Sequence, residues 1–184
     1  MYYCKLIKSN RRTLSLTIEQ DGTVTIRAPK RISQAHIDNF LKEKKKWIIK
    51  HIEKVKERQK QSEDFSQKID GTKIPQYKKR ARQIITERAD HFSEKHNLPY
   101  KSIRLSSAKT RWGSCGPTNN LNFNWIIMFA PPEVVDYLVV HELAHTKHRH
   151  HQKSFWKLVE EIDPGYKKNR KWLRDNAYLL STSF

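Results

Sequence analysis

The sequence of 184 residues contains little cysteine and few acidic residues. Its two cysteines, Cys4 and Cys115, are far apart and form no C-x-x-C pair, which argues against a disulfide framework and a cysteine zinc knuckle. Only 19 Asp and Glu stand against 37 Lys and Arg, so the formal net charge is +18. This excess indicates a nucleic acid or another polyanion as a partner, although a lysine-rich surface also serves solubility alone.

Long hydrophobic runs are also absent. No stretch approaches the roughly 20 apolar residues of a membrane-spanning helix, and residues 1–8 lack the apolar core of a secretory signal. The composition, 36% hydrophobic and 30% charged, is typical of a soluble folded protein. We therefore expect a cytoplasmic protein without a membrane partner, long enough for one domain or two small ones.

The most informative segment is H-E-L-A-H at residues 141–145. An apolar run with helical spacing leads into it, and the Pro-Pro-Glu segment at 131–133 resembles a helix start, so we expect a helix over residues 134–147. On such a helix His141 and His145 lie one turn apart on the same face. Two imidazoles in this arrangement can bind one metal ion.

This H-E-x-x-H pattern predicts a catalytic zinc site. The two histidines would bind one Zn²⁺ ion, and Glu142 would act as the general base that takes a proton from zinc-bound water. A third protein ligand would leave one coordination position open, as in catalytic rather than structural zinc sites. Five histidines between residues 141 and 151 leave a solvated, loosely metal-binding tract as the alternative. The apolar run before the motif favours the buried helix.

Three histidines are candidates for the third ligand: His148, His150 and His151. Spacing favours His151, because it is the eleventh residue counted from the first histidine, as in the metzincin pattern H-E-x-x-H-x-x-G-x-x-H. The glycine of that pattern is replaced by His148, and both methionines, Met1 and Met128, precede the motif, so no Met-turn can follow it. The protein is therefore not a metzincin, and only the ligand spacing is retained.

The first third of the chain has two regular patterns. Residues 12–29 alternate polar and apolar side chains around a turn at 20–22, which predicts a β-hairpin. Residues 34–60 have helical spacing of apolar residues and a strongly basic opposite face, which could grip phosphates or simply be solvated. The pattern is lost at residues 61–68, which indicates a linker or a domain edge.

Several short motifs surround the histidines. They are R-W-G-S-C at 111–115, L-N at 121–122, Pro131, D-Y-L-V-V-H-E-L-A-H at 136–145, H-Q-K-S-F-W at 151–156, Pro164 and W-L at 172–173. Together they resemble the YgjP-like metallopeptidase family, a relative of the SprT-like proteins and other small zincins. The resemblance implies that His141, His145 and His151 bind one Zn²⁺ ion and that Glu142 is the general base. It also implies that residues 111–115 lie near the site.

These patterns predict an α+β fold. Helices at 75–96 and after His151 would pack with a small sheet at 102–128 into a zincin-like catalytic core, preceded by a β-hairpin plus basic helix module. We assign residues 1–68 to this N-terminal module and residues 69–184 to the metallopeptidase domain.

The expected function is zinc-dependent hydrolysis, most directly of a protein or peptide substrate, with nucleic acid or another polyanion on the basic surface as a platform for substrate proteins. A metal-dependent nucleotide phosphohydrolase, of the nucleoside triphosphate pyrophosphatase type, is one alternative. It lacks support from a glycine-rich phosphate loop or an acidic two-metal cluster. A non-catalytic nucleic-acid-binding protein with a structural zinc is the other, and it would have no need of Glu142.

Overall fold

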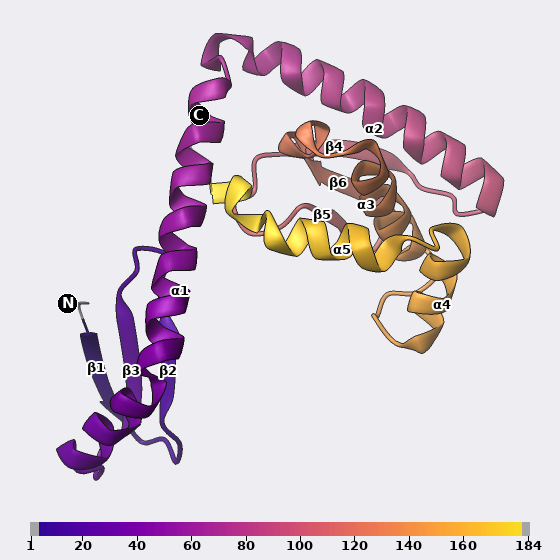
Figure 1. The fold of residues 1–184 in the computed structure, drawn as a ribbon. Coiled ribbons are helices and arrows are strands. Elements are labelled where there is room, and N and C mark those ends of the chain that lie inside the picture. Colours follow the sequence, from indigo (N-terminus) through magenta and orange to yellow (C-terminus); the bar gives the residue numbers. More distant parts are fainter. Residues whose placement is uncertain (1–3, 182–184) are drawn as a thin grey trace. The chain divides into compact units, whose positions relative to one another are not determined.

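The fold is α+β, as predicted, with five α-helices and two three-stranded sheets among the residues that the structure describes (Figure 1). The structure is a computed structural model and describes residues 4–181, so the outer ends of the two predicted domains, at residues 1 and 184, lie outside it. Contacts divide the chain into two compact units, Met1–Gln61 and Ser62–Phe184. The predicted boundary between the N-terminal module and the metallopeptidase domain, at residues 68 and 69, stays a prediction.

The first unit contains a sheet with strand order β1-β3-β2. Strands β2 (Ser15–Ile18) and β3 (Val24–Pro29) pair antiparallel and correspond to the predicted hairpin. Gly22 in the connecting turn has φ +84°, a left-handed conformation that favours glycine. Strand β1 (Cys4–Ser9) pairs parallel to β3, and the sequence patterns did not predict it.

Helix α1 (Gln34–Lys68) follows this sheet. Its Ile37 is buried with Ile26 and Ala28 of β3 in a small apolar core, so the start of the helix uses its apolar face against the sheet. The rest of the helix has few buried side chains, so most of its charged residues face solvent.

Residues 61–68 were predicted to be a linker or a domain edge, and the linker alternative is wrong, because α1 continues through this segment. The segment contains neither glycine nor proline, so nothing in it breaks a helix. Phe65 also packs edge-to-face on Phe129, with ring centroids 5.5 Å apart, which gives the last helical turns an apolar contact. The loss of periodicity marks the boundary between the two contact units, which falls at Gln61, rather than the end of a helix.

The second unit begins with the end of α1, a short 3₁₀ turn and helix α2 (Ile74–His96). Its sheet has the order β4-β6-β5 and contains β4 (Ser102–Ser106), β5 (Gly113–Cys115) and β6 (Asn120–Asn124). Strand β5 is an edge strand that pairs antiparallel to β6. The predicted sheet ended later, but Trp125–Phe129 forms a 3₁₀ helix, η2, instead of continuing β6.

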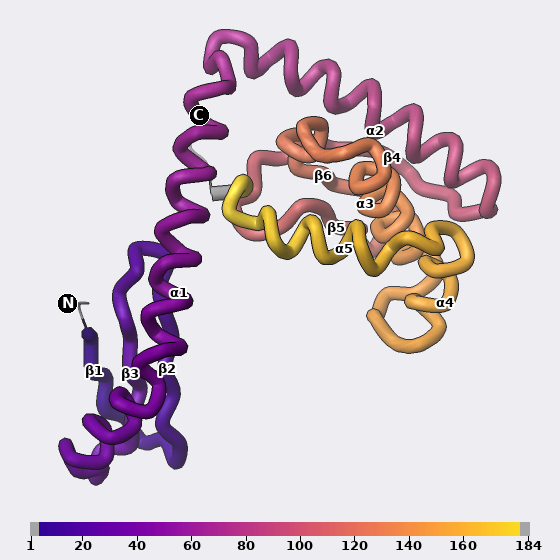
Figure 2. Tube along the Cα trace, viewed as in Figure 1, coloured from indigo at the N-terminus to yellow at the C-terminus, as the bar shows by residue number. Residues whose placement is uncertain are grey.

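The centre of the second unit is helix α3 (Pro132–Ala144). Nine of its thirteen residues are buried, as expected for a helix that is apolar on nearly all sides. The trace in Figure 2 shows α3 between α2 and α5 (Tyr166–Asp175), and it contacts both. A bidentate ion pair between Arg88 and Asp136, at 2.5 and 2.9 Å, connects α2 to α3.

Two further elements complete this unit. Helix α4 (Lys153–Ile162) precedes α5, and the 3₁₀ segment Ala177–Ser181 follows it. Among residues 4–181, no helix combines the length and the apolar character that crossing a membrane requires. The cytoplasmic location stays a prediction.

Candidate metal centre

The structure brings three predicted ligands together at the C-terminal end of α3. His141 lies in the last turn of α3, His145 follows the helix directly, and His151 lies in the loop before α4. The Nε2 atom of His151 is 3.1 Å from Nε2 of His141 and 3.1 Å from Nε2 of His145. All three candidate ligand atoms lie within 4.8 Å of one another.

These distances suit a shared metal ion. Zn–N bonds of roughly 2.0–2.1 Å in tetrahedral geometry place two ligand nitrogens about 3.3 Å apart. Among the described residues, the group of side chains that could hold a metal contains these three histidines and neither His148 nor His150. The helix ends at Ala144, earlier than the predicted residue 147, so the chain turns at His145 and returns His151 towards the helix.

Hydrogen bonds orient two of the imidazole rings. Nδ1 of His145 lies 2.8 Å from the backbone carbonyl oxygen of His148. A carbonyl only accepts, so Nδ1 carries the proton and Nε2 presents its lone pair to the shared point. Nδ1 of His141 lies 3.4 Å from the hydroxyl of Tyr137, one turn earlier on α3. The nitrogens that face the shared point are thus the ones left free to bind a metal.

Aromatic side chains of α4 support the three rings. Phe155 is fully buried, and its ring centroid lies 4.5 to 5.0 Å from those of all three histidines. Trp156 stacks on His151 at 5.7 Å, and its indole N–H donates to the His151 carbonyl at 3.1 Å. This packing restricts the ring positions and leaves the imidazole nitrogens free, because the one hydrogen bond from Trp156 to His151 goes to its backbone carbonyl.

The surroundings keep the imidazoles in their neutral form. Burial, together with the neighbouring His145 and His151, lowers the pKa of His141 to about 3. Burial also lowers the pKa of His145 and of His151 below the ordinary histidine value. Neutral imidazole is the form that binds metals, so the site is ready for a cation at neutral pH.

Glu142 points into the interior beside this cluster. Its side chain is 4% exposed, and burial raises its pKa to about 8, with the charge of Arg111 acting in the opposite direction. Its Oε2 atom has no hydrogen-bond partner among the residues that the structure describes. A buried carboxyl oxygen without a partner is costly, which fits a group that receives a proton from a bound molecule.

Gly113 of β5 lies against Glu142, a contact that the sequence patterns did not identify. A Cβ atom on residue 113 would lie 2.6 Å from Oε1 of Glu142, closer than side chains approach one another. Only glycine therefore lets the strand backbone pass beside this carboxyl. The contact agrees with the expectation that residues 111–115 lie near the histidines.

Arg149 is a second residue that the sequence patterns missed. It lies in the loop that carries the third histidine, and it donates to the backbone carbonyls of Gly116 at 2.8 Å and Pro117 at 3.1 Å. It also donates to the side-chain oxygen of Asn119 and contacts Sγ of Cys115 at 3.2 Å. One guanidinium thus connects the ligand loop to the turn between β5 and β6.

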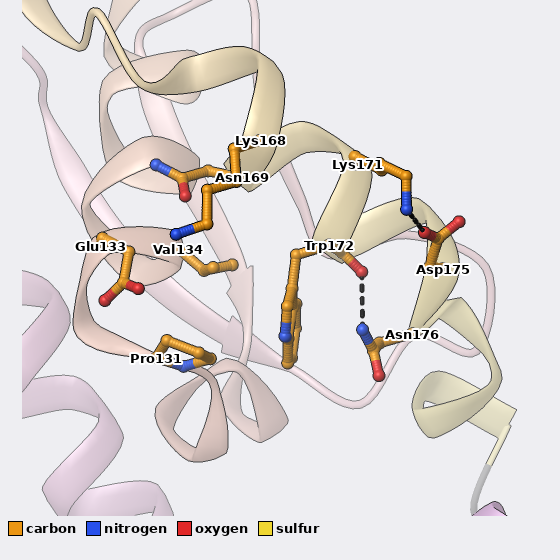
Figure 3. Close-up of a pocket in the computed structure, with 9 residues that line it drawn as sticks. All are labelled: Pro131, Glu133, Val134, Lys168, Asn169, Lys171, Trp172, Asp175 and Asn176. Carbon is orange, nitrogen blue, oxygen red and sulfur yellow. Dashed lines mark hydrogen bonds and ion pairs between the residues drawn. The ribbon is translucent and has the colours of Figure 1, made fainter.

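A separate pocket lies between the start of α3 and α5, as Figure 3 shows. Its lining consists of Pro131, Glu133, Val134, Lys168, Asn169, Lys171, Trp172, Asp175 and Asn176. Neither the three predicted histidine ligands nor the predicted base, Glu142, lines this pocket. In the close-up, Lys171 pairs with Asp175 at 2.6 Å, and Asn176 donates to the Trp172 carbonyl at 2.9 Å, so much of its polar lining is already paired.

Comparison with known proteins places the chain in a family. A family model described as YgjP-like, metallopeptidase domain matches residues 12–76 and 71–176, and no curated protein matches. One similar solved structure is the crystal structure of the metallopeptidase zymogen of Pyrococcus abyssi abylysin. It has 21% identity and a TM-score of 0.45, and the alignment covers 49% of this chain and 92% of that one. Because the family model matches well over half of the chain, the protein belongs to the YgjP-like metallopeptidase family.

Proposed function

We propose that the protein is a zinc-dependent peptidase in which His141, His145 and His151 hold one Zn²⁺ ion and Glu142 is the general base. Membership of a metallopeptidase family indicates metal-dependent cleavage of peptides as the reaction class. The observation that carries the assignment is the convergence of one imidazole nitrogen from each of the three histidines, all within 4.8 Å of one another, next to a buried carboxyl group in the sequence. Three histidine nitrogens are one of the ligand sets of catalytic zinc, and an adjacent carboxylate supplies the general base.

Glu142 would move the protons of the reaction. When bound, zinc supplies Lewis acidity that lowers the pKa of water and polarises a peptide carbonyl. Glu142 would be ionised beside a bound divalent cation, because the positive charge opposes the effect of burial on its pKa. Its unpaired Oε2 would accept a proton from the attacking water and would deliver a proton to the leaving amine.

The edge strand β5 is suited to hold the peptide. Among the described residues it pairs with β6 on one side only, since the sheet order is β4-β6-β5. Gly113 of this strand contacts Glu142, so a peptide that extends the sheet along β5 would pass close to the carboxyl group. Backbone hydrogen bonds of this kind position a substrate without demanding a particular side chain.

The substrates that we favour are proteins associated with nucleic acid. A formal net charge of +18 attracts polyanions and raises their local concentration at the protein surface. Protein substrates bound to the same polyanion would then reach the peptidase site at high effective concentration.

The decisive experiment compares the zinc-loaded full-length protein with its Glu142→Gln variant. The substrate is a loosely folded DNA-binding protein, offered with and without DNA, and nucleoside triphosphates are tested in parallel. We expect the substitution to reduce protein cleavage by roughly 100-fold or more, because a positioned general base contributes at least that factor. DNA should accelerate cleavage by the wild-type protein.

Glu94→Gln is the matched control, because it makes the same chemical change at an exposed position of α2. It should cleave like the wild-type protein. Release of phosphate from the nucleotides that is lost in Glu142→Gln, with all protein substrates left intact, would contradict the peptidase assignment and indicate a phosphohydrolase.

A further inference from the structure

Helix α1 exposes a tryptophan on a charged surface. Trp47 has 42% of its surface exposed, although large aromatic side chains are normally mostly buried. Its ring stacks on His51 with centroids 3.8 Å apart and an interplanar angle of 24°. Nδ1 of His51 donates to the backbone carbonyl of Trp47 at 2.8 Å, which fixes the histidine beneath the indole. The result is a rigid, solvent-facing aromatic platform.

Basic side chains surround this platform. Residues spaced by three, seven or eleven positions share a face of a helix. On the face of Trp47, these positions hold Lys44, Lys50, Lys54 and Arg58. Within residues 4–181 none of these four forms an ion pair, and the acidic residue nearest to Trp47 on this face is Glu43. The basic row extends for about 20 Å along the helix.

We propose that this face of α1 binds single-stranded nucleic acid, with a base stacked on Trp47 and phosphates paired with the flanking basic residues. Stacking platforms within positively charged tracks are the shared feature of proteins that bind single strands without reading their sequence. The inference deepens the platform part of the proposed function by naming the partner and its location. It does not depend on the zinc chemistry.

The tryptophan selects single strands over other polyanions. In a duplex, each base already stacks on its neighbours, so an exposed indole gains little from contact with it. Polyanions without bases, such as heparin, would use the lysines but not the ring. Removing the ring therefore separates the three partners, whereas removing positive charge weakens binding to all of them.

The test is fluorescence anisotropy of a labelled 20-nucleotide oligo-dT strand with the full-length protein at several salt concentrations. We expect Trp47→Ala to weaken binding roughly fivefold to 100-fold, the range for loss of one base-stacking aromatic. Trp47→Tyr should keep most of the affinity. Ile49→Ala is the matched control, because Ile49 is also 42% exposed and lies on the opposite side of the same helix.

A second set of variants tests the charged row. The logarithm of the affinity falls as the logarithm of the salt concentration rises. Replacing Lys44, Lys50 and Lys54 together by Gln should make this negative slope less steep by about 2. The matched set, Lys45→Gln with Lys56→Gln and Lys60→Gln, removes the same charge from the other side of α1 and should change the slope less. Circular dichroism confirms that each variant keeps its helices.

Two results would overturn the inference. One is Trp47→Ala binding the strand as tightly as the wild-type protein does. The other is an equal loss of affinity for oligo-dT, duplex DNA and heparin on this substitution. The Glu142→Gln variant should bind the strand normally, so failure of this inference and failure of the peptidase assignment give different results.

Discussion

Gly113 and Glu142 constrain each other at the scale of single residues. A methyl group at position 113 would meet Oε1 of Glu142 at 2.6 Å, and Glu142 has almost no exposed surface into which it could move. We therefore expect Gly113→Ala to displace the carboxyl group or the strand. A displacement of about 1 Å at a catalytic group costs on the order of 100-fold in rate, and overpacking costs about 1–3 kcal/mol of stability.

Peptidase assays and thermal melts of Gly113→Ala would check this expectation. Gly71→Ala is the control, because a Cβ atom at position 71 meets no atom within 4 Å and should leave the activity unchanged. Metal content should stay the same in both variants, since the three atoms nearest to a Cβ at position 113 all belong to Glu142 and a Cβ at position 71 meets no atom within 4 Å. Full activity of Gly113→Ala would show that the close approach is not required.

Local spacing made part of the site predictable. His141 and Glu142 lie in the last turn of α3 and His145 is the residue that caps it with helical backbone angles, so their relation follows from helical periodicity. The proximity of Gly113 to Glu142 does not follow from any local pattern, because it depends on how β5 packs against α3. The contacts of Arg149 could not be predicted for the same reason, since its acceptors are backbone carbonyls of a turn that is distant in the sequence.

At the scale of elements, the loop between α3 and α4 depends on Arg149 for its attachment to the sheet. Its guanidinium donates to the carbonyls of Gly116 and Pro117 in the β5–β6 turn at 2.8 and 3.1 Å, and it contacts Sγ of Cys115 at the end of β5 at 3.2 Å. We expect Arg149→Ala to free this loop and to weaken binding of the proposed zinc ion roughly 10- to 100-fold, as loss of groups that position metal ligands does. Arg149→Lys should restore little of the metal affinity, because a single ammonium group cannot reproduce the planar set of guanidinium donors.

Competition with a chromophoric chelator would measure the zinc affinity directly. Lys147→Ala in the same loop is the matched control, because it removes one positive charge from an exposed side chain. It should bind zinc like the wild-type protein. An Arg149→Ala variant with unchanged zinc affinity would show that Phe155 and Trp156 are sufficient to hold His151.

The helices were more predictable than the strands and the segment boundaries. The sequence predicted α2, α4 and α5 because each has an apolar face at helical spacing. Strand β1 was missed because most of its side chains are exposed and its pairing with β3 is parallel, so no hairpin turn signals it. At residues 61–68 the helical spacing of apolar residues is lost where α1 continues from the first contact unit into the second, and the helix itself does not end there.

At the scale of the whole molecule, the proposed activities are distributed between the two units. The histidine cluster and Glu142 lie in Ser62–Phe184, and Trp47 with its basic row lies in Met1–Gln61. The family model also matches in two segments, residues 12–76 and 71–176, which together cover both units. Binding and cleavage should therefore be separable by point mutations within the intact chain.

Metal removal should lower the stability of one of the two units only. A ligand that binds only the folded state stabilises it by about 2.7 kcal/mol at a free concentration 100 times its Kd. Because all three histidines belong to Ser62–Phe184, chelation should remove this stabilisation there and leave Met1–Gln61 unchanged. Hydrogen exchange measured on peptides, with and without chelator, would locate the loss of protection.

The His141→Ala variant is the control for metal removal, since its exchange should no longer respond to the chelator. In the wild-type protein, we expect faster exchange in α3 and α4 after chelation, because these helices carry or support the ligands. The sheet of β1, β2 and β3 should exchange at the same rate in both conditions. Equal loss of protection in that sheet would show that α1, which is continuous across the boundary, couples the two units into one cooperative structure.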